Sequence, residues 1–581
     1  MYTTIHEGTC LNRASAPSRK RTRQNPTWAT CAGKIWPSSP APGGPTIDVV
    51  GQLTFVDTHD GNERYALIDA EGQVTPFSAN FKPPEVDKNE QEIETGAIVG
   101  MTCTVGSLGY CPGCNYTANP SCTCEDEGTP ACASAKQTDV SLVKSAYQVA
   151  AMESPITRQR LLVMILDYSN CGFAPTLDEV TATKLYLGPN RDGQGGVAKQ
   201  FELCSYGKLT LSANGFRAAK IAPVCSTAVT ASCSWWAISA GADNAAKKAL
   251  GAQFYNFTHY TYVVPPGLQS VCPWAGLALL PGRQTWLQTS SYGVYRWGTV
   301  MQESIHNYGL WHSWRNGIEY EDYSTAMGRG DACPSAPEIS RMGWATPAVG
   351  GGAINSAVLP LAGPRSWTLP ATYLTGDNNY LRIQPDWLPA YAATETAKNL
   401  YIALRVAKSG DAALGSFYAN KLNVHEVNAT MEDVYPIKSP NADRRIALIS
   451  GVDPMATRIL AAYNLVVYAG SWAGTDIIRV HLCRFSVNAS ECPPLAVIEN
   501  RPPLPPSPRP PPPSPTPPPP PSPVPPSPPP PPPSPKPPAP PPPSPRPSSP
   551  RKMAPSPRSP PFAKPLPSPR KPPRPPTIGR R

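Results

Sequence analysis

The proline content of the last 81 residues limits how much of this 581-residue chain can form a packed core. Residues 501–581 hold 45 of the 78 prolines, arranged as Ser-Pro units and proline blocks. Proline lacks the backbone N–H that helices and sheets need, and its ring restricts φ. We therefore expect a disordered, extended polyproline II tail, with the fold confined to the residues before it.

The tail also carries the basic charge of the chain. It holds 13 of the 51 Lys and Arg residues and none of the 41 Asp and Glu residues, so the remainder has a net charge of about −3. A basic groove is therefore not predicted, and we expect no nucleic-acid partner. No run approaches about 18 apolar residues, so we also expect no membrane span.

Cysteine usage and glycosylation sequons indicate an oxidising, extracellular environment. The chain has sixteen cysteines and sequons at Asn115, Asn256, Asn428 and Asn488. One cysteine cluster has only one CxxC pair and no histidine, which favours disulfides over a zinc site: Cys103, Cys111, Cys114, Cys122, Cys124 and Cys132. The N-terminus shows no apolar core of signal-peptide length. A wrong or missing first exon, unconventional export and an intracellular protein are the alternatives.

Four patterns divide the rest of the chain. Residues 1–45 are polar, basic and rich in Pro and Ser, and we expect them to be disordered. Alternating runs after residue 46 indicate a small antiparallel β unit, extending with the cysteine cluster to residue 150. The apolar run RLLVMIL (160–166) predicts a buried central strand in an α/β region covering 151–350. Residues 351–500 are predicted to be mainly β, with strands in NLYIALRVA, KLNVHEVNA, RIALISGV, YNLVVYAG and DIIRVHLCRF.

The stretch from Gln302 to His312 has the spacing of a metal site. On a helix, Gln302 and His306 lie four residues apart and share one face, so both can reach one ion. Glu303 is offset by one position, which suits a carboxylate beside the metal. Gly309 can adopt positive φ and turn the chain so that His312 returns to the same ion. Three protein ligands leave a coordination position for water, as a hydrolytic site needs.

A chance ExxHxxGxxH match is on the order of one in several thousand for a chain of this size and composition. The alternative is a capped core helix with two hydrogen-bonded histidines. We interpret His259, His425 and His481 as packing or surface residues rather than ligands.

The QExxHxxGxxH stretch resembles the metzincin motif HExxHxxGxxH, with Gln302 in the first ligand position. Met327, in STAMGRG, resembles the Met-turn methionine that lies beneath the metal in that clan. Over roughly residues 47–490 the chain is similar to the gametolysin family of algal extracellular-matrix metallopeptidases, through WAGLALLPG (274–282), APEISRMGWA (336–345) and residues 401–414. The resemblance implies a metzincin-like catalytic domain at 151–350, with a mixed sheet and an active-site helix, and a propeptide-like unit at 46–150.

The resemblance and the site chemistry together predict residue roles. Glu303 is the general base, while Gln302, His306 and His312 are the metal ligands. Met327 is a structural support. Tyr323 precedes Met327, whereas the metal-facing tyrosine of some metzincins follows it, so we interpret Tyr323 as a packing residue.

Gln302 departs from the motif. A neutral amide oxygen binds zinc less well than an imidazole nitrogen, so zinc affinity should fall and copper becomes possible. Family members with Gln in this position, some linked with copper, favour an active enzyme over a degenerate pseudo-enzyme.

The expected function is a secreted endopeptidase of the extracellular matrix or cell wall. Its substrates would be proline-rich glycoproteins, and its tail would retain it in the matrix. The alternatives are a non-catalytic structural matrix protein and an intracellular scaffold with PxxP motifs, the latter disfavoured by the sequons and cysteines. A cysteine of the 46–150 unit, Cys111 or Cys114, is a candidate latency cap, although disulfide pairing is favoured.

Overall fold

The computed structural model describes residues 46–57, 63–78, 81–106, 131–150, 157–393, 396–429 and 445–500. All of these residues belong to the first of two compact units, Met1–Pro503 and Leu504–Arg581. The predicted disordered segments at 1–45 and 501–581 lie outside the described residues, as do Asn115, Cys111 and Cys114.

The N-terminal part forms an antiparallel sheet, as its alternating runs predict. The strand order is β3-β2-β1-β4-β5, with β6 also paired to β4. A short helix, α1 (Ala146–Ala150), follows the last strand. The strands are β1 (Thr46–Asp57), β2 (Glu63–Ile68), β3 (Val74–Pro76), β4 (Ile98–Gly106), β5 (Ala131–Ser134) and β6 (Val140–Lys144).

The middle of the chain forms a mixed sheet of order β10-β11-β9-β7-β8, in which only the edge strand β10 is antiparallel to its neighbour. Its strands are β7 (Thr157–Leu166), β8 (Leu209–Ile221), β9 (His259–Val264), β10 (Gly276–Ala278) and β11 (Gln284–Gln288). The helices of this region are α2 (Glu179–Leu187), α3 (Gly196–Ser205), α4 (Thr227–Thr230), α5 (Trp235–Leu250), α6 (Trp297–His306) and α7 (Ala336–Arg341).

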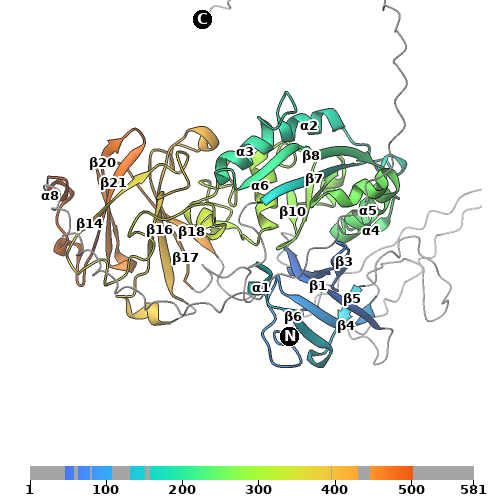
Figure 1. Ribbon diagram of the computed structural model, residues 1–581, viewed down its shortest axis with the longest axis horizontal. Coiled ribbons are helices and arrows are strands. Elements are labelled where there is room, and N and C mark those ends of the chain that lie inside the picture. Colours follow the sequence, from blue (N-terminus) through green and yellow to red (C-terminus); the bar gives the residue numbers. More distant parts are fainter. Residues whose placement is uncertain are drawn as a thin grey trace, which may run out of the picture. The chain divides into compact units, whose positions relative to one another are not determined.

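Helices cover both faces of this sheet, with α2 and α3 on one side and α4 and α5 on the other (Figure 1). Strand β7 is continuously apolar because both of its faces are buried. Its odd-numbered residues from 161 to 165 join the core with α2, α3 and α6, and its even-numbered residues from 162 to 166 join the core with α4 and α5. A strand buried on both faces needs apolar side chains at every position.

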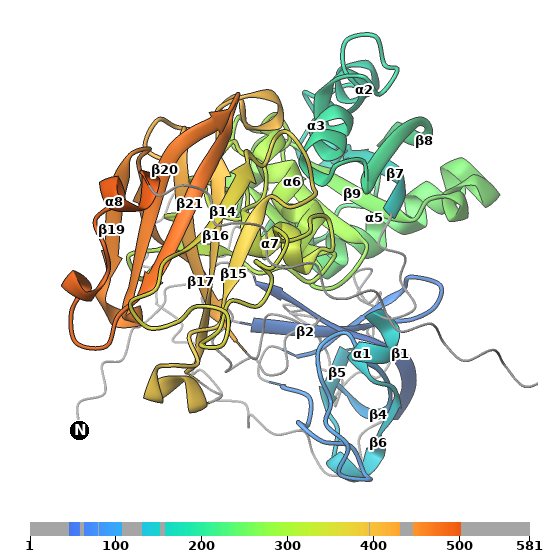
Figure 2. The same ribbon diagram turned by 60° about the vertical axis from the view of Figure 1, so that its left-hand side comes forward.

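Two further sheets form the C-terminal part, and they pack face to face through one apolar core (Figure 2). One has the order β13-β12-β18-β17-β16-β15 and the other β14-β21-β20-β19. All five strands predicted here are present. The elements are β12 (Ser313–Arg315), β13 (Ile318–Glu319), β14 (Arg365–Pro370), β15 (Tyr380–Ile383), β16 (Lys398–Arg405), β17 (Lys421–Asn428), β18 (Ile446–Val452), β19 (Ala456–Leu460), β20 (Leu465–Gly474), β21 (Ile477–Arg484) and α8 (Leu495–Glu499).

Strand β12 joins the C-terminal sheets to the middle of the chain. It pairs in parallel with β18, so that Ser313 lies opposite Ile446. The core beneath the mixed sheet likewise includes Tyr380, Tyr401 and Ile446. The packing is therefore continuous across residue 350, where the sequence pattern changes from α/β to β.

Ten cysteines of the described residues form disulfides, as the extracellular interpretation predicts. Sequons at Asn256 and Asn488 are exposed, whereas Asn428 is buried. None of the described helices has both the length and the apolar composition to cross a bilayer. The disulfide pairs are Cys103–Cys132, Cys171–Cys225, Cys204–Cys333, Cys233–Cys272 and Cys483–Cys492.

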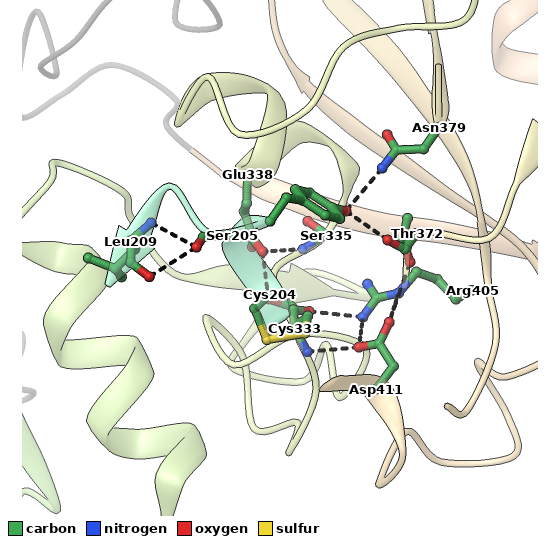
Figure 3. The surroundings of a disulfide bond; sticks show 12 residues. Cys204, Ser205, Leu209, Cys333, Ser335, Glu338, Thr372, Asn379, Arg405 and Asp411 are labelled. Carbon is green, nitrogen blue, oxygen red and sulfur yellow. Dashed lines mark hydrogen bonds and ion pairs between the residues drawn. A yellow bond between two sulfur atoms is a disulfide. The ribbon is translucent and has the colours of Figure 1, made fainter. Parts of the chain in front are cut away.

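A buried ion pair lies beside one of these disulfides (Figure 3). Arg405 and Asp411 are each 1% exposed, and their closest nitrogen and oxygen are 2.6 Å apart. Arg405 also donates to the carbonyl of Cys333 at 2.9 Å, and the Cys333 N–H donates to Asp411 at 2.8 Å. Because Cys333 is bonded to Cys204 at the end of α3, this cluster ties strand β16 to the helical layer.

We predict that Asp411→Ala destabilises the protein by about 3–5 kcal/mol, because it leaves a buried guanidinium without its counter-ion. The matched control is Asp453→Ala, which breaks the pair of Lys421 with a 69% exposed carboxylate and should cost less than about 1 kcal/mol. Urea unfolding followed by tryptophan fluorescence measures both. Equal losses in the two variants would contradict a structural role for the buried pair.

Candidate metal centre

Helix α6 carries three of the predicted site residues in the protein interior. Gln302 is 7% exposed, Glu303 4% and His306 5%. The helix ends at His306, and Gly309 follows with φ of 84°. The Gly309 N–H donates to the carbonyl of His306 at 2.8 Å. A residue with a Cβ is strained at this φ, so the predicted glycine turn is confirmed.

The turn brings the two predicted histidine ligands together. The ring centroids of His306 and His312 are 4.7 Å apart, and the rings are nearly perpendicular at 84°. His306 Nδ1 lies 2.7 Å from the carbonyl of Leu310, and His312 Nδ1 lies 2.7 Å from Glu319 Oε1. Both oxygens can only accept hydrogen bonds. Each Nδ1 therefore donates, and in the neutral imidazole this places the free lone pair on Nε2, the atom that would bind a metal.

The paired imidazoles of His306 and His312 supply two of the three protein ligands that a hydrolytic zinc site needs. Among the described residues, no three His, Cys, Asp or Glu side chains form a group that could hold an ion. Gln302 lies one helical turn before His306, on the face that the i, i+4 rule predicts. Its role as third ligand stays a prediction.

Glu303 lies against the edge strand of the mixed sheet. A Cβ added to Gly276 would come within 2.6 Å of Glu303 Oε1 and 2.7 Å of its Cγ. A larger residue at position 276 would therefore displace this carboxylate from its place beside β10. Glu303, His306 and His312 line one small cavity of about 10 Å³ together with Leu277, Ala278, Leu280 and Trp311. That volume is roughly the space for one water molecule.

Met327 is fully buried beside the ligand loop. Its carbonyl accepts the N–H of Ser313, the residue after His312, at 2.9 Å. The surrounding turn is tight, because a Cβ at Gly328 would lie 1.9 Å from the carbonyl oxygen of Asp322. The structure thus places Met327 against the chain that carries His312, while its position beneath a metal stays a prediction.

A buried carboxylate supports the same loop from below. Asp322 accepts hydrogen bonds from Ser313 Oγ at 2.7 Å and from the Ser324 N–H at 2.9 Å, and it lies 3.0 Å from His425 Nε2. Burial raises the pKa of Asp322, but the hydrogen bonds from His425, Ser324 and Ser313 together outweigh it and leave the pKa below its usual value. His425 is thus a buried packing residue with a defined polar partner.

Sequence reasoning missed two residues next to His312. Glu319 orients the imidazole as described above, and the Tyr320 hydroxyl lies 3.1 Å from His312 Nε2. The β12–β13 hairpin returns both residues to His312, and Tyr320 has φ of 64°. No residue spacing in the sequence predicts this return. Tyr323, which we expect to be a packing residue, is 40% exposed and is therefore only partly packed.

Comparisons with known proteins point to a peptidase family. The family profile described as gametolysin peptidase M11 matches residues 160–462, which include the mixed sheet, helix α6 and most of the C-terminal strands. A protein named autolysin from Chlamydomonas reinhardtii is 34% identical over 100 residues. That alignment covers 15% of this chain and 15% of the relative. No solved structure matches the chain.

We predict that Glu319→Ala lowers zinc affinity about 10- to 100-fold, because His312 loses the carboxylate that orients its ring. Glu321→Ala is the control, since this more exposed side chain lies 3.9 Å from Arg329 and makes no hydrogen bond with His312 among the described residues. Calorimetric titration of the metal-stripped proteins measures both affinities. Unchanged affinity in Glu319→Ala would show that His312 does not hold the ion.

Proposed function

The chain belongs to the gametolysin peptidase M11 family, and we propose that it is a secreted, metal-dependent endopeptidase with a metzincin-like catalytic domain. One observation supports this most directly. The Glu303 carboxylate and the paired imidazoles of His306 and His312 line a single buried cavity at the edge strand of the mixed sheet.

Each side chain of the candidate site can have a separate role in peptide hydrolysis. A metal ion bound by His306, His312 and Gln302 would lower the pKa of a water and polarise the scissile carbonyl. Glu303 would take the proton of that water and deliver it to the leaving amine. The Tyr320 hydroxyl lies beside His312 Nε2, where a hydrogen-bond donor can stabilise negative charge developing on the substrate oxygen.

Two observations support an extracellular-matrix substrate: the disulfides and the similarity to autolysin. The described disulfides suit an oxidising compartment, and the matching relative carries the name autolysin. We propose proline-rich matrix glycoproteins as substrates and matrix or wall retention through the tail. A non-catalytic matrix protein is less well supported. It leaves unexplained why Glu303, His306 and His312 line one cavity.

We predict that Glu303→Gln lowers kcat/KM for a proline-rich peptide by about 10²–10⁴-fold, because an amide cannot accept the proton. Zinc affinity should stay within about threefold of the parent, since the carboxylate is offset from the ligands. Turnover by mass spectrometry and calorimetric zinc titration measure the two quantities. Near-normal turnover would exclude Glu303 as the base.

We also predict that Gln302→His tightens zinc binding by about tenfold or more and raises zinc-supported turnover. The reason is that imidazole nitrogen is a better zinc ligand than an amide oxygen. Any advantage of copper over zinc in the parent should shrink. The test titrates each metal into stripped parent and variant and measures turnover. Unchanged zinc affinity would mean that residue 302 does not face the metal.

A further inference from the structure

Strand β1 has one edge that its own sheet does not complete. Residues 46–52 pair with β4, and residues 52–57 pair with β2 on the opposite side. Leu53 continues the β4-side pairing with Gly96 and Ala97, and beyond Leu53 this edge needs other partners. Phe55 uses this edge to pair with Leu280, which follows β10 in the mixed sheet. The Phe55 N–H donates to the Leu280 carbonyl at 3.2 Å, and the Leu280 N–H donates back at 2.9 Å.

The partner of Phe55 lines the candidate site. Leu280 and Trp311 belong to the cavity that holds Glu303 and the two histidines. The Phe55 ring is 2% exposed, and its centroid lies 5.3 Å from that of Trp311. Trp311 in turn lies 4.7 Å from His312, ring to ring. One aromatic side chain of the N-terminal sheet is therefore buried against the wall of the catalytic cavity.

We propose that Leu280 and Trp311 form a substrate subsite for an aromatic or large aliphatic side chain of an extended peptide, and that β1 is its built-in occupant. An extended peptide binding at the cleft edge would make the antiparallel backbone pair that Phe55 makes with Leu280. This inference rests on the proposed peptidase function. Beyond that function, it specifies the type of substrate side chain that the cleft selects. It also specifies that β1 must leave before a substrate can bind.

Further contacts strengthen the occupation of this edge. Thr54 is fully buried, and its Oγ donates to the carbonyl of Pro281 at 2.6 Å. Leu280 and Trp311 share one apolar core with Leu53 and Phe55 of the N-terminal sheet. A covalently attached competitor acts at an effective concentration of about millimolar. A peptide at micromolar concentration therefore binds poorly until β1 is displaced.

The test uses the full chain carrying Glu303→Gln, so that binding is measured without cleavage. Two variants are compared in that background, Phe55→Ala and Phe77→Ala. Phe77 is a 4% exposed residue of the same N-terminal core that pairs with Phe81 instead of Trp311. The probes are fluorescein-labelled blocked heptapeptides, Gly-Ser-Gly-Phe-Gly-Ser-Gly and its Ala counterpart, followed by fluorescence anisotropy. Exchange of the Leu280 amide hydrogen gives a readout independent of any peptide.

In Phe55→Ala we expect the Phe peptide to bind about tenfold tighter than in Phe77→Ala, and about tenfold tighter than the Ala peptide, because burying a large apolar side chain is favourable. The Leu280 amide should exchange faster only in Phe55→Ala. Adding Trp311→Ala should remove the preference for Phe. If Phe55→Ala does not fold, Thr54→Val, which removes only the hydrogen bond to Pro281, should show the same changes at smaller size.

Equal binding in Phe55→Ala and Phe77→Ala, or equal binding of the two peptides, would overturn the proposal. Turnover by Phe55→Ala with Glu303 restored separates this inference from the proposed function. Cleavage without any preference for Phe refutes the subsite and leaves the peptidase intact. Selective binding of the Phe peptide without cleavage supports the subsite and refutes the peptidase.

Discussion

The return of the chain at Gly309 is the constraint on which the candidate site depends. It brings His312 back to within 4.7 Å of His306, ring to ring, after a helix that has just ended. A turn alone does not hold two imidazoles in place. The carbonyl of Leu310 orients one ring, and Glu319 from the β12–β13 hairpin orients the other. Each hydrogen bond satisfies a buried Nδ1–H that would otherwise be costly.

The C-terminal sheets also help to hold the loop that carries His312 in place. Strand β12 begins one residue after His312 and pairs with β18, so that the ligand loop is part of a sheet built from the end of the chain. Below it, His425 of β17 faces Asp322, which also accepts the hydroxyl of Ser313. The family match spans both the α/β region and these strands, and the shared core gives a physical reason for that extent.

The edge strand β10 and the residues after it contact both the candidate site and the N-terminal sheet. Glu303 approaches it so closely that a Cβ at residue 276 would displace the carboxylate. Beyond the strand, Leu280 pairs with Phe55 of the N-terminal sheet. The same short segment therefore positions the carboxylate and carries the contact that closes the cleft. A small cavity of about 10 Å³ remains between them.

Local patterns in the sequence determined the elements and the ligand spacing. Residues 302, 303 and 306 lie within one helix, and the strands of the C-terminal part alternate or run apolar as their burial requires. The turn at Gly309 can also be predicted from the sequence, because glycine adopts positive φ without the strain that a Cβ causes. Family resemblance added Met327, whose spacing alone does not place it beside the ligand loop.

Only the tertiary structure decided which distant segments complete the site. Glu319 and Tyr320 reach His312 through a hairpin whose strand β12 joins β18, whereas Tyr323, three residues on from Tyr320, is 40% exposed. Phe55 reaches the cleft because β4 and the residues before it pair with β1 only as far as Leu53. Such contacts join residues from about seven to more than two hundred positions apart. They depend on sheet order and packing, which no local periodicity records.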